Sequence, residues 1–82
     1  MLMKKTFGKN VKYYRYKMGY SQERLAEILD MNVSYLSQIE NGNHNITFDR
    51  IIELARVLKV EPNLLFEKCS NDIPNRITEF KK

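Results

Sequence analysis

Apolar residues recur at helical spacing along most of the chain, and breaks in that pattern divide it into five predicted helices. The first spans residues 6–18, where four apolar positions at i, i+4, i+7 and i+11 form one stripe. These positions are Phe7, Val11, Tyr14 and Met18. Gly19 follows them and can take the left-handed conformation that ends a helix.

A second helix is predicted from residue 22 to about residue 29. Ser21 is a suitable N-cap, because its hydroxyl can accept from the free N–H groups of the next turn, and Glu23 places negative charge in that first turn. The apolar face of this helix is assigned to Leu25, Ala26, Ile28 and Leu29.

A third, short helix is predicted over residues 33–41. Asn32 can cap it, and the pair Asn41-Gly42 can close it. Leu36 and Ile39 are its inward-facing residues. With barely two turns, such a helix depends on packing, because nucleation is costly at this length.

Two more helices complete the predicted bundle. Thr47 caps the fourth, whose stripe is formed by Ile51, Leu54, Ala55 and Leu58. Pro62 suits the first turn of a short fifth helix, although Glu61 is a poor cap for it. This helix carries Leu64, Leu65 and Phe66. The predicted fold class is therefore all-α, a compact five-helix bundle.

Residues 69–82 are polar and follow this bundle. We predict a domain over residues 1–68 and a flexible tail over residues 69–82. A short strand or a partner-binding segment is the other interpretation of the tail, which carries Pro74 and scattered apolar residues.

The second and third helices, joined by about three residues, predict a helix-turn-helix. With Leu36 and Ile39 inward, helical geometry turns outward a face that is uncharged and, apart from Val33, polar. That face consists of Val33, Ser34, Ser37, Gln38 and Asn41. Glutamine can pair bidentately with adenine, serine can donate or accept, and valine can touch a thymine methyl. The alternative is an ordinary solvent-exposed face.

Charge is distributed unevenly along the 82 residues, which carry a formal net charge of +4. Residues 1–24 contain seven basic side chains and one acid, whereas residues 25–82 contain seven bases and nine acids. This asymmetry suits nucleic acid or an anionic membrane surface, and a solvated helix face is the simpler alternative. Neither a signal-peptide core nor a membrane span is evident, so a cytoplasmic protein without membrane association is expected.

No catalytic constellation is apparent, and an enzyme is not expected. Cys69 is the single cysteine, which excludes an intrachain disulfide. His44 is the single histidine and has no metal-ligating neighbour in the sequence, so a surface loop residue is expected. We predict no metal, no cofactor and no small-molecule ligand.

The sequence also resembles the Cro and phage-repressor family, or xenobiotic-response-element (XRE) family, of helix-turn-helix proteins. The resemblance covers about residues 6–67 and is carried by many positions in register. They include Phe7, Gly8, Val11, Arg15, Gly19, Tyr20, Ser21, Gln22, Leu25 and Ala26, the run from Val33 to Gly42, and Leu54, Ala55, Leu58, Val60, Leu64, Leu65 and Phe66.

This resemblance implies a lambda-repressor-like bundle whose third helix enters the major groove of DNA. Val33, Ser34, Ser37 and Gln38 would then face base edges. The residues implied near the DNA backbone are Gln22, Tyr35, Asn41, Asn43 and His44. The family also suggests a structural ion pair between Arg15 and Glu40, and we expect Glu40→Ala to destabilise the fold.

Position 33 departs from the family pattern. Phage repressors often have a polar residue that contacts bases there, whereas this chain has Val33. Base readout is therefore expected to be modest, with DNA shape contributing. The loop after Gly42 carries no lysine or arginine, and Lys4, Lys5 and Lys9 could compensate if they lie near the DNA backbone.

A single short helix reads only a few base pairs, which is too little to select one site in a genome. We therefore expect a homodimer on a near-palindromic operator, with an interface drawn from Val57, Leu64, Leu65 and Phe66. The expected function is a sequence-specific transcriptional regulator, in particular a repressor, with some likeness to the controllers of restriction-modification operons. The alternatives are an antitoxin-like interaction module whose tail binds a partner protein, and an RNA-binding form of the same bundle.

Overall fold

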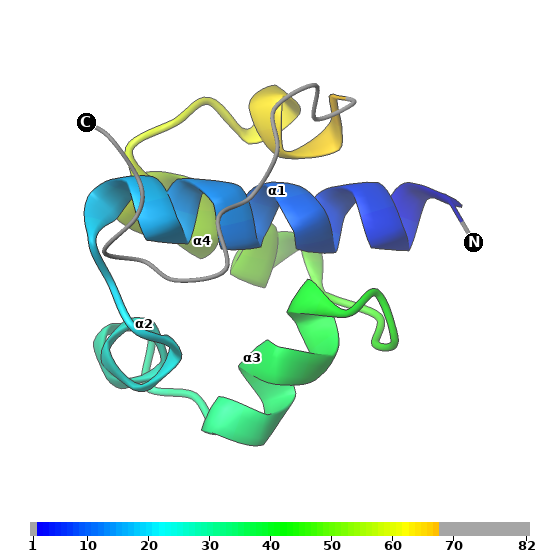
Figure 1. Ribbon diagram of the computed structural model, residues 1–82. Coiled ribbons are helices and arrows are strands. Elements are labelled where there is room, and N and C mark those ends of the chain that lie inside the picture. Colours follow the sequence, from blue (N-terminus) through cyan, green and yellow to red (C-terminus); the bar gives the residue numbers. More distant parts are fainter. Residues whose placement is uncertain (1, 68–82) are drawn as a thin grey trace.

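Helices are the only regular secondary structure in residues 2–67, the part of the chain that the computed structural model describes (Figure 1). Four are α-helices: α1 (Leu2–Met18), α2 (Gln22–Ile28), α3 (Val33–Glu40) and α4 (Phe48–Leu58). The long helix α1 crosses the molecule and contacts α3 and α4, while α2 packs on α3. The prediction of an all-helical fold is therefore confirmed.

The fifth predicted helix is a 3-10 helix, η1 (Pro62–Phe66), rather than an α-helix. Glu61 makes no side-chain capping bond to it, and the amide of Leu64 donates to the carbonyl of Glu61 over 2.9 Å. A segment of this length is better suited to such i→i+3 bonds than to an α-helix. The bundle thus has four α-helices and one 3-10 helix within residues 2–67.

Helix α1 begins at Leu2, four residues before the predicted start. The prediction began the helix at Thr6, directly before the apolar stripe, but no glycine or proline precedes this position to stop the helix. The additional turn carries Met3, Lys4 and Lys5 along the same axis, which brings these side chains to the loop after α3.

The predicted N-caps are confirmed for α2, α3 and α4. Ser21 Oγ accepts from the amide of Arg24 over 3.0 Å, and Asn32 Oδ1 accepts from the amide of Ser34 over 2.7 Å. Thr47 Oγ1 accepts from the amide of Arg50 over 3.2 Å. Each cap satisfies an N–H group that the helix itself leaves without a partner, so these three starts are encoded locally.

A left-handed residue follows each α-helix in residues 2–67. Gly19 (φ 80°) and Gly42 (φ 75°) take this position after α1 and α3, as predicted. After α1, Tyr20 N donates to Arg15 O over 3.1 Å, closing the turn characteristic of such helix ends. After α2 and α4 the position is held by Asp30 (φ 53°) and Lys59 (φ 61°), which pay a steric penalty that glycine avoids.

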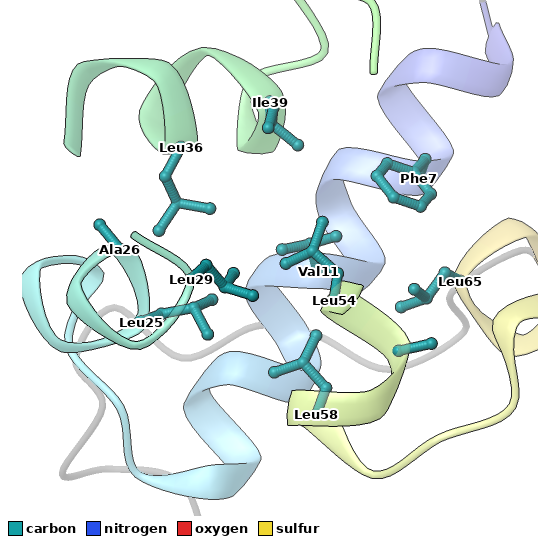
Figure 2. Packing of buried hydrophobic residues seen from close by; sticks show 11 residues of the cluster. Phe7, Val11, Leu25, Ala26, Leu29, Leu36, Ile39, Leu54, Leu58 and Leu65 are labelled. Atoms are coloured by element: carbon teal, nitrogen blue, oxygen red, sulfur yellow. The ribbon is translucent and has the colours of Figure 1, made fainter. Parts of the chain in front are cut away.

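The core lies where all five helical segments meet (Figure 2). Its buried apolar side chains are Phe7, Val11, Leu25, Ala26, Leu29, Leu36, Ile39, Leu54, Ala55, Leu58 and Leu65. Most of the predicted apolar face is confirmed, with Tyr14, Met18 and Ile51 partly buried against the cluster. Ile28 was wrongly assigned to this face: it is 37% exposed, because the core-facing side of the short α2 is already filled by its neighbours.

The predicted tail, residues 69–82, and Cys69 with it, lie outside the described residues. In the described part of the chain, no helix combines the length and the apolar character that crossing a bilayer requires.

Candidate nucleic-acid interface

Helices α2 and α3 form the predicted helix-turn-helix, and small and apolar side chains set their approach. Leu36 points from α3 toward Ala26 and Leu29 of α2 (Figure 2). Ala26 is 1% exposed and Leu36 is fully buried. A larger side chain at position 26 would have to displace α3, so this alanine fixes how closely the two helices pack.

The outer face of α3 is accessible. Ser34, Gln38 and Asn41 are exposed, Val33 is 37% exposed and Ser37 is half-buried. The face therefore carries amide, hydroxyl and methyl groups and no charge. Such groups match the donors, acceptors and thymine methyl that base pairs present in the major groove.

The residues expected near the DNA backbone lie at the C-terminal end of α3 and in the loop after it, or contact that end of the helix. Asn43 and His44 are exposed in the loop that follows α3, and Tyr35 is half-buried with its ring 4.8 Å from that of His44. The two rings meet edge to face, at an interplanar angle of 89°. This contact holds the loop against the helix.

Arg15 of α1 and Glu40, the last residue of α3, form the ion pair that the family resemblance implies. Arg15 Nε donates to Glu40 Oε2 over 2.6 Å, and Nη2 donates to Oε1 over 3.1 Å. Their side chains are 5% and 2% exposed. Arg15 also donates to the carbonyl of Tyr20 over 2.9 Å. The bidentate geometry is the stronger form of this pairing, and it fixes the last turn of α3 to α1.

Gln22, the first residue of α2, takes part in the same cluster. Its Nε2 donates to Glu40 Oε1 over 3.0 Å, and the side chain is half-buried. The family resemblance implied that Gln22 meets a phosphate or an edge base, and it did not connect Gln22 to Glu40. Because Gln22 bonds the carboxylate that holds α3, it links the start of α2 to the end of α3.

Gly8 allows α1 to reach the end of α3. A Cβ at this position would lie 2.7 Å from the carbonyl oxygen of Glu40 and still closer to that of Ile39. Both atoms belong to the backbone, so neither can rotate away. Gly8 is one of the residues that carry the family resemblance. Its role in packing could not be predicted, because the contact joins α1 and α3, which lie far apart in the sequence.

Two other positioning residues were missed by the sequence reasoning. Arg50 of α4 donates to the carbonyl of Leu29 at the end of α2 over 2.8 Å, where a cation is favoured by the helix dipole. Asn10 is 3% exposed and donates to the carbonyls of Leu65 and Glu67, over 2.9 and 2.6 Å. In the sequence, the only indication that Asn10 has a structural role is its place among apolar positions of α1. Nothing in the sequence indicates the contact that Arg50 makes.

Basic side chains from the first turn of α1 lie beside the loop after α3. The backbone and Cγ of Lys5 lie against Gly42, within 3.2 Å of a Cβ built there. Lys4 lines a groove together with His44 and Asn45. The loop contains no lysine or arginine of its own, but α1 brings positive charge to it. Residues 2–67 contain no cluster of three or more metal-ligating side chains.

Residues 11–65 match the family model described as helix-turn-helix. Control protein C.BamHI of Bacillus amyloliquefaciens is 37% identical to the chain over 62 residues, which cover 74% of this chain and 76% of that protein. Control protein C.SmaI of Serratia marcescens is 36% identical over 66 residues, which cover 79% of each chain.

A solved structure has the same fold. The restriction-modification controller protein C.AhdI from Aeromonas hydrophila matches with a TM-score of 0.75 and 33% sequence identity. The match covers 80% of this chain and 100% of that one. The similarity therefore extends over the whole bundle and is not confined to α2 and α3.

Proposed function

The chain belongs to the helix-turn-helix family of transcriptional regulators, of XRE type, and from that premise we propose that it binds a near-palindromic operator as a homodimer. Its relatives are regulators and control proteins, and the chain is accordingly not an enzyme. We infer further that it represses transcription, as a controller of the restriction-modification type.

The observation that carries this proposal is the uncharged face of α3 on a rigid support. The Gln38 amide can bond both N6 and N7 of an adenine, and the Ser34 and Ser37 hydroxyls can donate or accept at a base edge. The methyl groups of Val33 fit beside a thymine methyl. Such contacts require fixed positions, which the bonds from Arg15 and Gln22 to Glu40 provide at the far end of the helix.

Contacts to the DNA backbone would orient α3 without reading sequence. We assign them to Gln22, Tyr35, Asn41, Asn43 and His44. The lysines that α1 places beside Gly42 and His44 add positive charge on the same side of the molecule. Each phosphate neutralised by such a cation releases counterions, so affinity should fall as salt rises.

A homodimer follows from the small number of bases that one α3 can read. Of the apolar residues first considered for its interface, Leu65 is fully buried and completes the core of the monomer. Val57 and Leu64 are half-buried, and Phe66 is 39% exposed. Met3 and Phe48, which were not among the predicted interface residues, are 63% and 74% exposed. Met3 and Phe66 line a largely apolar surface groove of about 320 Å³, together with Ile46 and Ile51.

We therefore place the dimer interface on the apolar lining of this groove and on Phe48, and leave its polar lining, Lys4, His44 and Asn45, to the DNA. Apolar patches of this kind commonly mark protein–protein contacts, and a second copy would remove them from water. Sedimentation at micromolar concentration should give the mass of a dimer. Phe48→Ser should shift the equilibrium to monomer, whereas Lys17→Ser, an exposed residue of α1, should leave it unchanged.

Selection of bound duplexes from a random DNA pool tests the proposed function. A dimer of this type should enrich a motif with two-fold symmetry, its half-sites about 10 base pairs or a multiple of one helical turn apart. A promoter carrying that motif should lose activity when the protein is expressed. The absence of any enriched motif would refute sequence-specific binding, and increased promoter activity would refute repression.

A further inference from the structure

The loop that follows α3 holds His44 in one defined tautomer. His44 Nδ1 lies 2.7 Å from the carbonyl oxygen of Asn45. A carbonyl oxygen only accepts hydrogen bonds, so Nδ1 must carry the hydrogen of this pair. In the neutral ring, Nε2 then has no hydrogen and acts only as an acceptor. The edge-to-face contact with Tyr35 keeps the ring in this orientation.

This geometry makes the contact of His44 with DNA depend on a proton. Phosphate oxygens accept hydrogen bonds, and the neutral His44 has no donor left to offer them. The imidazolium donates from both nitrogens, so it can keep the bond to Asn45 and donate to a phosphate from Nε2. We propose that His44 is a proton-dependent phosphate contact, and that DNA binding takes up a proton at this residue.

The groups that face His44 favour this linkage. The groove beside it is lined by one cationic side chain, Lys4 of α1, and by apolar side chains from α1, α4 and η1. Tyr35 of α3 presents a neutral phenol ring. No carboxylate lines this groove in the described part of the chain. A DNA phosphate at this groove would therefore meet the cation of Lys4 and, when His44 carries its second proton, an imidazolium beside it.

The proposal rests on DNA binding as proposed above, and it can be tested separately. Fluorescence anisotropy would measure the Kd for a duplex obtained by selection, between pH 5.5 and 7.5 at constant ionic strength. His44 is the single histidine in the chain, and other side-chain types ordinarily titrate outside this range. Binding should be about three- to tenfold tighter at pH 5.5 than at pH 7.5, because one pKa unit of difference corresponds to tenfold in affinity.

Two substitutions separate charge from shape. His44→Gln has no titratable group, so its affinity should be the same at both pH values. His44→Lys carries its charge throughout, so it should bind more tightly than the unmodified protein at pH 7.5 and should not respond to pH. Because position 44 is exposed, both variants should retain the helical circular dichroism of the unmodified protein.

Isothermal titration in two buffers of different ionisation enthalpy gives an independent measure. The observed binding enthalpy should differ between the buffers for the unmodified protein, as proton uptake requires, and should agree for His44→Gln. An unmodified protein whose Kd does not change with pH, or a His44→Gln variant with an unaltered pH response, would overturn this inference alone. Failure to bind any duplex at any pH would overturn the proposed function as well.

Discussion

Removing the Glu40 carboxylate is the substitution whose effect the structure specifies most closely. In Glu40→Ala, Arg15 keeps its charge and its bond to the carbonyl of Tyr20 but loses both bonds to the carboxylate. Gln22 loses its bond to the carboxylate too. At 5% exposure, the Arg15 side chain has little water to replace them.

The expected loss is about 3–5 kcal/mol of the free energy of unfolding, which is typical when one member of a buried ion pair is removed. Domains of this size have total stabilities of roughly 4–12 kcal/mol, so a large part would be lost. Each kcal/mol corresponds to about 4–8 °C in Tm for a domain of 60–100 residues. Urea denaturation followed by circular dichroism would measure the change from the midpoint and slope.

Two control variants test whether the loss of stability comes from breaking a buried ion pair or from removing any charged side chain. Glu27→Ala removes the partner of Arg24 in an ion pair whose side chains are 59% and 72% exposed, and it should cost less than about 1 kcal/mol. The double variant Arg15→Met with Glu40→Leu removes both charges and should recover most of the stability. If Glu40→Ala unfolded at the same urea concentration as Glu27→Ala, the reasoning about this pair would be wrong.

Three further substitutions test the packing around the helices. Gly8→Ala should cost about 1–3 kcal/mol in the free energy of unfolding, because its Cβ would meet the backbone carbonyls of Ile39 and Glu40; an unchanged Tm would contradict the close approach of α1. Lys59→Gly should raise the stability by up to about 1 kcal/mol, since φ is 61° there, and a lower urea midpoint would refute this. Asn10→Ala should cost about 1–3 kcal/mol by leaving two carbonyls without their donor, and hydrogen exchange should increase in η1.

Local signals in the sequence were sufficient for most helix boundaries. The caps at Ser21, Asn32 and Thr47 and the glycines at 19 and 42 each act within one turn, so the residues themselves indicate where a helix begins or ends. The start of α1 was wrong because the predicted helix began at Thr6, although Met3, one turn before Phe7, continues the apolar stripe. The α-helix predicted at Pro62 was wrong because five residues without a side-chain cap form a 3-10 helix instead.

Contacts between distant segments could not be obtained in the same way. Asn10 reaches carbonyls more than 50 positions away, and Arg50 reaches the end of α2. Neither spacing follows from helical periodicity, since both depend on how the helices pack. The ion pair between Arg15 and Glu40 was expected from the family resemblance and not from the residues. The participation of Gln22 and the placement of Lys4 and Lys5 became evident from the structure.

The most direct test of the account concerns the outer face of α3. Ser34, Ser37 and Gln38 would be replaced together by alanine, and affinity would be measured for a selected duplex and for a scrambled one. We predict that the free energy of unfolding measured with urea stays within about 1 kcal/mol of that of the unmodified protein, because these side chains lie outside the core. The variant should bind both duplexes with the same weak affinity. A folded variant that kept its affinity and its preference for the selected duplex would contradict the central claim.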